Sequence, residues 1–214
     1  VFQTYFQFCT QDLSSFYFDI RKDVLYCDSE DSLKRKATLK VLDILFFRLT
    51  TWFSPILPFT MEEVYLERFP ESEHSVHLLD IPKLEKDWYD PNHLKDWNKI
   101  RNVRRVVTGA IEVLRQDKVI GSSLEASAVI YIKDKDLFEM IKSVDMSEVC
   151  ITSGISVEFS TTIIADTCFV LDDVPDVGVI CKTAEGKKCL RCWTLNLPLD
   201  KNEGDLCDRC QSAV

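Results

Sequence analysis

The first 120 residues carry apolar side chains at the spacing of helices, in steps of three and four. The first stripe predicts one long helix, and its members are Phe2, Phe6, Cys9, Leu13, Phe16 and Ile20. A second stripe, from Leu33 to Trp52, predicts a helix that ends before Pro55, because proline cannot continue a helix. The sequence Thr60-Met61-Glu62-Glu63 has the form of a capping box. A third, shorter helix is therefore expected from Thr60 to about Phe69.

A fourth helix is predicted to begin at Asp90-Pro91, since proline is tolerated in a first turn, and to end at Gly121. Its apolar face consists of Ile100, Val103, Val106, Val107, Ala110, Ile111 and Leu114. Its opposite face carries Arg101, Arg104, Arg105 and Arg115. Such a basic stripe is either a solvated helix face or a phosphate-binding surface. Trp97 lies on the arginine side by helical count, which is unusual for a face that is only solvated.

Residues 120–188 change to short β-branched and aromatic runs. Strands are expected at Ala128–Ile132, Val149–Ile151, Val157–Phe159, Cys168–Leu171 and Val177–Ile180, and a short helix at Asp136–Ser143. The pattern as a whole predicts a mainly α protein in three parts. These are a helical-bundle domain at residues 1–121, a small mixed α/β subdomain at 122–184 and a zinc ribbon at 185–214, which we call the cysteine module.

The cysteine module contains two C-x-x-C pairs, Cys189 with Cys192 and Cys207 with Cys210, separated by fourteen residues. This spacing is typical of a four-thiolate zinc site in which each pair forms a tight knuckle. The alternatives are four unrelated cysteines, or two disulfides in a secreted module, although nothing else in the sequence indicates secretion. Because the module has little apolar material of its own, we expect one structural zinc ion to supply its folding free energy.

Composition and charge narrow the class of protein only in part. The chain has 214 residues, of which 46% are hydrophobic and 29% charged, as in an ordinary globular protein. Charged residues and prolines interrupt the most apolar stretch, 41–59, so no membrane span is expected. The net charge of −9 argues against nucleic acid, but acidic residues gather at 62–90 and 134–148, whereas basic residues gather in helical stripes and in the cysteine module.

Nine cysteines without a secretory context indicate the reducing cytoplasm. The five outside the two pairs are expected to be small buried hydrophobic residues; they are Cys9, Cys27, Cys150, Cys168 and Cys181. Nothing in the sequence predicts catalysis, since it has no glycine-rich phosphate loop, nucleophile elbow or arrangement of paired carboxylates and histidine. A closed four-thiolate site also leaves no open position for metal chemistry.

Seven segments match one enzyme family in order. They are Cys9–Ser14, Phe16–Asp23, Leu25–Asp28, Ser54–Thr60, Ser75–Leu78, Ile120–Ala126 and Lys188–Trp193. Together they resemble bacterial isoleucyl-tRNA synthetases, from the anticodon-binding helical domain to the C-terminal zinc module, over nearly the whole chain. Valyl and leucyl relatives share a similar helical domain, whereas a terminal C-x-R-C-W ribbon is typical of the isoleucyl family.

The resemblance implies a parent class I aminoacyl-tRNA synthetase, a cytoplasmic monomer that joins isoleucine to its tRNA at the expense of ATP. The family's ATP-binding catalytic domain and its editing domain lie upstream in the same polypeptide, and its two activation motifs do not occur here. This segment alone is therefore not expected to be catalytic. The implied partner is the anticodon arm of tRNA(Ile), and the implied cofactor is one structural zinc.

Basic residues beside an aromatic ring suit a phosphate backbone and a stacked base. The candidate RNA contacts are Lys187, Lys188, Arg191 and Trp193 in the cysteine module, accompanied by Lys201 and Arg209, with Arg101, Arg104 and Arg105 on the fourth helix. Arg191 and Trp193 flank a ligand, so both point outward or one of them packs inward under the metal. The polar cluster Asp19, Arg21, Lys22 and Asp23 has no assigned role beyond salt bridging at a helix end.

Two other functions remain open from the sequence. The chain could be a protein-interaction module in which the zinc ribbon is a structural end-cap, or the equivalent region of a valyl or leucyl relative. RNA docking requires a positive face and weakens steeply with salt. A protein partner instead predicts an exposed apolar patch of several hundred Å².

Overall fold

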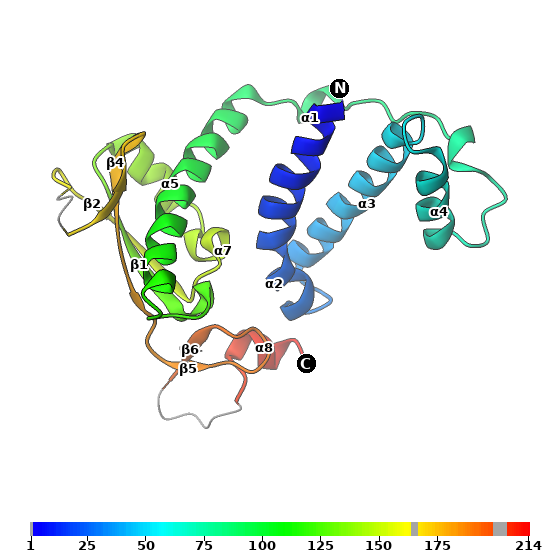
Figure 1. Ribbon diagram of the computed structural model, residues 1–214. Helices are drawn as coiled ribbons and strands as arrows, with labels where there is room; N and C mark the ends of the chain where they lie inside the picture. Colours follow the sequence, from blue (N-terminus) through cyan, green and yellow to red (C-terminus); the bar gives the residue numbers. More distant parts are fainter. Residues whose placement is uncertain (1, 164–166, 199–204) are drawn as a thin grey trace. The chain divides into compact units, whose positions relative to one another are not determined.

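The computed structural model describes residues 2–163, 167–198 and 205–214 (Figure 1). Spatial contacts divide the chain into two compact units. One is formed by Val1–Cys27 with Pro91–Val214 and includes the cysteine module, and the other is formed by Asp28–Asp90. The division into three parts at residues 121 and 184 stays a prediction.

The larger unit begins with a continuous helical segment made of α1 (Phe2–Gln7), a π-helical stretch (Phe8–Phe18) and α2 (Asp19–Cys27). It resumes with α5 (Pro91–Gln116), a short 3₁₀ turn (Ser123–Glu125), β1 (Ala126–Ile132), α6 (Lys135–Lys142), α7 (Met146–Cys150), β2 (Gly154–Phe159), β3 (Phe169–Leu171) and β4 (Val174–Thr183). The cysteine module adds β5 (Lys187–Lys188), β6 (Leu195–Leu197) and α8 (Asp208–Ser212). The predicted mainly α fold with a small mixed sheet is confirmed.

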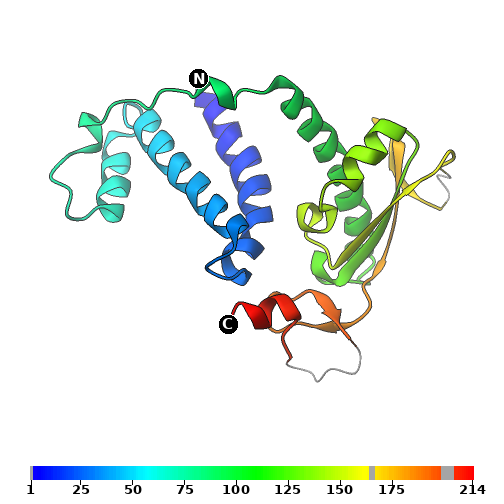
Figure 2. The same ribbon diagram turned by 180° about the vertical axis from the view of Figure 1, so that it is seen from behind.

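The sheet of the larger unit has four strands in the order β2-β1-β4-β3. Its central strand β1 pairs parallel with β2 and antiparallel with β4. Alternate residues of β1 are buried and join a single hydrophobic cluster with apolar residues of α5, α6 and α7. Because side chains alternate between the faces of a strand, these helices cover one face of the sheet (Figures 1 and 2).

The apolar face predicted for the fourth helix is the core of the larger unit. Six of its seven residues are at most 5% exposed, namely Ile100, Val103, Val106, Val107, Ala110 and Ile111. Gly109 allows the helix to approach the sheet closely, since a Cβ there would lie 2.6 Å from the ring of Phe169 in β3. The helical periodicity of this stretch is thus confirmed.

The predicted end of this helix at Gly121 was wrong. α5 ends at Gln116, and Lys118 takes the left-handed backbone conformation with φ 58°. The backbone N–H of Val119 then donates to the carbonyl of Leu114 over 2.9 Å, which closes the last turn. A non-glycine residue therefore fills the position that glycine most often takes at a helix end.

The first apolar stripe does not run along one buried face. Leu13 and Ile20 are buried, but Phe2 and Phe6 are each 59% exposed. The reason is the π-helical stretch, whose hydrogen bonds span five residues and whose wider turns rotate the stripe out of register with a 3.6-residue repeat. The helix was predicted, but its single apolar face was not confirmed.

The smaller unit contains α3 (Leu33–Phe53), α4 (Pro58–Arg68) and two 3₁₀ turns, at Val76–Leu78 and Lys86–Trp88. α3 ends before Pro55, as predicted, and it begins after Ser32, whose side chain caps its first turn. The capping box at Thr60 was wrong: α4 has Leu57 at its N-cap and Pro58 in its first turn. Proline's fixed φ is suited to the first helical position, so the helix starts two residues earlier.

One predicted strand is a helix. Val149 and Cys150 lie in α7, which is capped by Asp145, whose carboxylate accepts from the backbone N–H of Glu148 over 3.1 Å. Ile151 follows in the left-handed conformation. A local cap thus overrides the β propensity of these residues. The strands predicted within β1, β2, β3 and β4 and the helix predicted over α6 are confirmed.

Within the described residues, every helix is too short or too polar to cross a bilayer.

The core position Ile130 generates a stability prediction. Ile130 is fully buried in β1, whereas Ile180, in the paired strand β4, is 37% exposed. Ile130→Ala should lower the free energy of unfolding by about 2–5 kcal/mol, because it removes buried methyl groups and leaves a cavity. The matched control Ile180→Ala should cost less than about 1 kcal/mol. Urea unfolding followed by circular dichroism measures both, and equal losses would contradict this packing.

Candidate metal centre and its surroundings

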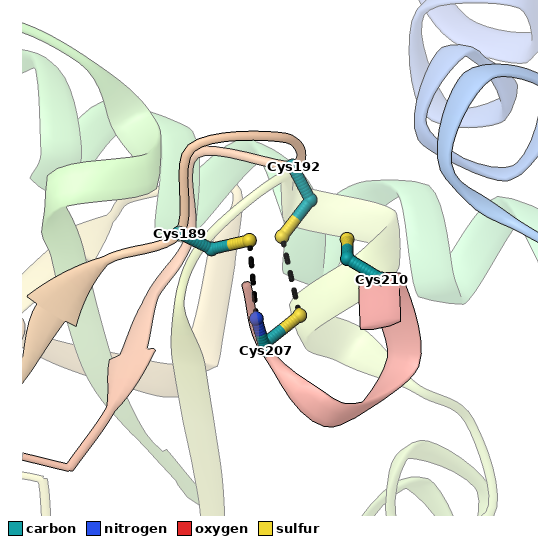
Figure 3. Close-up of side chains that lie close together, drawn as sticks. All are labelled: Cys189, Cys192, Cys207 and Cys210. Atoms are coloured by element: carbon teal, nitrogen blue, oxygen red, sulfur yellow. Dashed lines mark hydrogen bonds between the residues drawn. The ribbon is translucent and has the colours of Figure 1, made fainter. Parts of the chain in front are cut away.

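The four cysteines of the cysteine module converge on one point (Figure 3). Their sulfur atoms all lie within 4.8 Å of one another, and all four side chains are buried. Cys189 and Cys192 come from the first knuckle, and Cys207 and Cys210 from the start of α8. All nine cysteines, each of which lies among the described residues, are free thiols, so the disulfide alternative is not supported.

The spacing of the sulfurs fits a tetrahedral zinc ion. A zinc–sulfur distance of about 2.3 Å places the sulfurs of a regular tetrahedron about 3.8 Å apart. The Sγ atoms of Cys192 and Cys207 are 3.7 Å apart. Four inward-facing thiols and no exposed position make this a closed site, which is typical of structural rather than catalytic zinc.

Local backbone geometry builds the first knuckle. The N–H of Trp193 donates to the carbonyl of Cys189, and the N–H of Cys189 donates to the carbonyl of Thr194, both over 3.0 Å. This tight turn places Trp193 in the left-handed conformation, with φ 66°. The antiparallel pairing of β5 with β6 then carries the chain away from the knuckle.

Backbone donors favour the thiolate form of Cys189. Burial alone raises the pKa of this thiol, but backbone N–H groups of Cys192, Cys207 and Arg191 outweigh it and lower the pKa to about 6. The N–H of Cys207 approaches the Cys189 sulfur at 3.4 Å. Burial raises the pKa values of Cys207 and Cys210, and a bound zinc ion would favour their deprotonation, because the ligand is the thiolate.

Trp193 lies at the surface of the cysteine module. The residue is 59% exposed, and its indole N–H donates to the carbonyl of Leu190 over 3.2 Å. The ammonium group of Lys188 lies 5.3 Å from the ring centroid. Of the two orientations left open by the sequence, Trp193 takes the outward one. Lys187 is half-buried in β5, and Lys201 lies outside the described residues.

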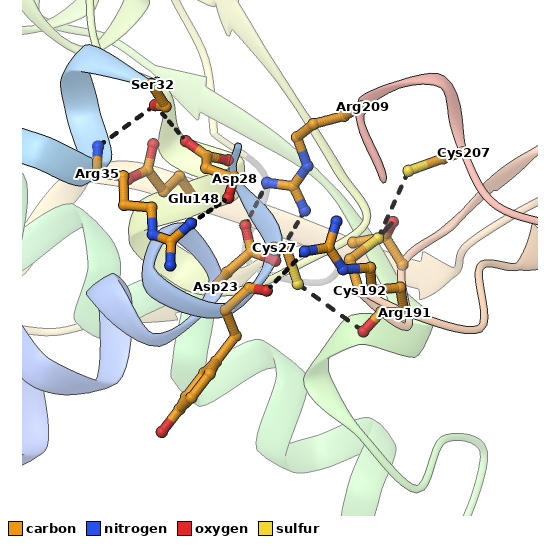
Figure 4. A network of polar contacts seen from close by, with 12 residues as sticks. Asp23, Cys27, Asp28, Ser32, Arg35, Glu148, Arg191, Cys192, Cys207 and Arg209 are labelled. Carbon is orange, nitrogen blue, oxygen red and sulfur yellow. Dashed lines mark hydrogen bonds and ion pairs between the residues drawn. The ribbon is translucent and has the colours of Figure 1, made fainter. Parts of the chain in front are cut away.

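Arg191 turns inward instead. Its guanidinium donates to the carbonyl of Cys210 over 3.3 Å and to the carbonyl of Tyr26 in α2 over 3.2 Å. The same side chain thus connects the two knuckles with the end of α2 (Figure 4). Its role as an RNA contact stays a prediction.

The three arginines proposed on α5 have protein partners. Arg101 pairs with Asp12 at 2.6 Å and lies over the ring of Phe16. Arg104 donates to the carbonyl of Val149 over 2.9 Å, and Arg105 pairs with Asp173 at 2.8 Å. Trp97, which packs edge-on against Phe16, lies in the same neighbourhood. Their RNA contacts also stay predictions.

The polar cluster on α2 has structural partners that the sequence did not indicate. Asp19 lies 3.9 Å from Arg104 of α5, Arg21 pairs with Glu148 of α7, and Asp23 pairs with Arg209 of α8. The expected salt bridging is present, but to distant elements as well as along the helix: 127 residues separate Arg21 from Glu148, and 186 separate Asp23 from Arg209. The only sign of these contacts in the sequence was the clustering of charged residues in Phe16–Asp23, a segment that resembles the synthetase family, and it did not name the partners.

Cys27 completes the surroundings of the metal centre. It is 5% exposed and belongs to the same buried cluster as the four ligands. Its thiol lies 3.8 Å from the carbonyl of Arg191, and burial raises its pKa to about 11. Cys27 is therefore a neutral packing residue between α2 and the cysteine module, in line with its predicted buried role.

Comparison with known proteins gives consistent similarities. Residues 1–130 match the family model for the anticodon-binding domain of tRNA ligase. Over its whole length the chain is 47% identical to an isoleucine–tRNA ligase of Ruegeria pomeroyi, of which it covers 22%. Over 87% of its length it is 50% identical to an isoleucine–tRNA ligase of Brucella abortus, and over 88% it is 48% identical to that of Agrobacterium fabrum, covering 19% of each. The chain thus spans about a fifth of the length of these curated relatives.

The sulfur geometry predicts one zinc ion per chain. Metal analysis should give one zinc, and X-ray absorption should give four sulfur neighbours at about 2.3 Å. Cys189→Ala should reduce zinc binding and unfold the cysteine module, because metal binding supplies its folding energy, while the sheet and α5 keep their own core.

The matched control is Cys181→Ala. Cys181 lies in β4 and packs against the core of the sheet and helices rather than against the four ligands, so this variant should retain one zinc. A folded, reduced protein without metal would contradict the zinc assignment, and so would equal zinc content in both variants.

Proposed function

The chain belongs to the family of anticodon-binding domains of tRNA ligases, and from this we propose that it docks the anticodon arm of tRNA(Ile) as part of an isoleucine–tRNA ligase. The observation that carries the proposal is the outward Trp193 beside Lys188 on the first knuckle. An exposed ring and a cation on rigid backbone suit a splayed base and its neighbouring phosphate. The isoleucine–tRNA ligases that resemble this chain support the choice of amino acid.

A bound zinc ion would affect RNA binding only by fixing the backbone that carries the RNA-binding side chains. Zinc held by Cys189, Cys192, Cys207 and Cys210 would fix the turn on which Trp193 sits. The left-handed backbone at Trp193 gives its side chain a defined direction. Zinc supplies a closed cross-link and no reaction step, and the residues of this chain provide the binding surface.

The arginines of α5 differ in how readily they could meet phosphate. Arg104 is only 20% exposed and is held by Val149 and Asp19. Arg105 and Asp173 are 54% and 60% exposed, and an exposed ion pair of this kind is weak. We therefore favour Arg105 as the arginine that exchanges its carboxylate for an RNA phosphate, with Arg101 and Arg104 holding the fold around Phe16.

For the whole protein we propose ATP-dependent charging of tRNA(Ile) in the cytoplasm by a monomeric enzyme. Its catalytic site would lie in another part of the polypeptide, because the chain spans about a fifth of its relatives. The segment described here would contribute affinity and the choice of tRNA. Five free thiols in addition to the four of the metal site support a reducing compartment.

The test is a titration of the zinc-loaded chain with tRNA(Ile) and, as a matched competitor, tRNA(Val). The proposal requires tighter binding to tRNA(Ile), with affinity falling steeply as salt rises, because phosphate contacts release counterions. Equal binding of the two tRNAs would point to a nonspecific basic surface. Absence of binding at low salt would overturn the proposal and favour the protein-interaction alternative.

Trp193→Ala should weaken tRNA(Ile) binding about 5- to 150-fold, since stacking on an aromatic ring contributes about 1–3 kcal/mol per base. Trp193→Phe should retain most of the affinity. The matched control is Trp88→Ala. Trp88 is 61% exposed, close to the value for Trp193, and it likewise lies near a cation, Arg48. Unchanged affinity in a zinc-loaded Trp193→Ala protein would remove this residue from the RNA surface.

A further inference from the structure

The cysteine module contacts the C-terminal part of α2 through Asp23, Tyr26 and Cys27, and we call these three residues the seat of the module. Arg209, which stands next to the ligand Cys210, makes two hydrogen bonds to the carboxylate of Asp23, one of them over 2.8 Å. Arg191, between the ligands of the first knuckle, donates to the carbonyl of Tyr26. Both knuckles are therefore tied to the same helical turn (Figure 4).

The contacts of this seat combine charge with burial. Asp23 and Arg209 are only 35% and 42% exposed at their side chains, so the pair is partly shielded from solvent. Its bidentate geometry fixes direction as well as distance. Beside it, Cys27 is buried against the four ligands, which closes the apolar part of the contact. A bound zinc ion would hold the fold of the module itself. The contacts of the seat fix the orientation of the module relative to the helices.

The remainder of the polar cluster anchors the helix that carries the seat. Arg21 pairs with Glu148 of α7, and Glu148 is only 16% exposed. Asp19 faces Arg104 of α5 and accepts from Lys22 over 2.8 Å. Successive turns of α2 thus bind the sheet-covering helices at one end and the cysteine module at the other.

We propose that Asp23 is a positioning residue for RNA: by clamping Arg209 it holds the cysteine module, and with it Trp193, in one orientation relative to α2 and α5. This inference rests on the proposed function. A module already held in its binding orientation loses less conformational freedom when tRNA docks, so affinity increases without any contact from Asp23 itself. The Asp19-Arg21-Lys22-Asp23 cluster would thus contribute to tRNA binding by holding the cysteine module in place, without touching the RNA.

The experiment compares Asp23→Asn with Glu112→Gln in the zinc-loaded chain. Glu112 forms an ion pair with Arg115 at 3.0 Å on α5, so both variants remove one negative charge from a carboxylate–arginine pair. Charge alone predicts slightly tighter RNA binding in both. The clamp predicts instead that only Asp23→Asn weakens tRNA(Ile) binding, by about two- to tenfold.

A second readout does not involve RNA. Backbone hydrogen exchange at residues 24–27 of α2, followed by mass spectrometry, should be about two- to tenfold faster in Asp23→Asn than in the parent or Glu112→Gln, because release of the module exposes this end of the helix. Zinc content should stay at one per chain. Asp23→Glu retains the charge and should restore both the slow hydrogen exchange and the affinity.

The outcomes separate this inference from the function on which it rests. If the parent chain fails to bind tRNA(Ile), the proposed function falls and the RNA role of Asp23 falls with it. If the parent binds and Asp23→Asn binds equally well, the positioning role is overturned while the function stands. Equal hydrogen exchange at residues 24–27 in Asp23→Asn and Glu112→Gln would also overturn the clamp.

Discussion

The larger unit depends on the burial of α5 from two sides. Val103, Val106 and Val107 are fully buried in a core shared with the sheet. Ile20 of α2 belongs to the same core, and Phe16 packs against its edge. A single amphipathic helix therefore determines where both the sheet and the first helix lie, and the position of α2 in turn determines where the cysteine module can sit.

The polar contacts add direction to this apolar framework. Partly exposed ion pairs such as Arg21–Glu148 and Asp23–Arg209 each contribute little to the free energy of folding. Their value lies in where they occur, because they connect elements that are distant in sequence to one helix. Hydrophobic burial is nondirectional, whereas a forked guanidinium on a carboxylate selects one orientation of the attached module.

Sequence patterns predicted the features whose physical cause is local. The four-cysteine cluster was predictable because two knuckles bring four thiols together through short-range spacing, and the valines of α5 were predictable because strong burial imposes a regular repeat. The π-helical stretch was not, since a shift in backbone hydrogen bonding leaves no mark on apolar spacing. Val149 and Cys150 have strand propensity, but a cap at Asp145 prevails. The partners of Arg21 and Asp23 are set by tertiary packing alone.

The left-handed backbone of Trp193 has a consequence for how this module can change through evolution. A non-glycine residue in this conformation carries strain of about 1–3 kcal/mol, and Trp193 has φ 66°. Glycine would relieve that strain and make the knuckle more stable, but it would delete the exposed ring. If the ring stacks on RNA as proposed, selection for stability and selection for recognition favour different residues at this one position. Where the tryptophan persists, the gain from its side chain must exceed the strain of the turn.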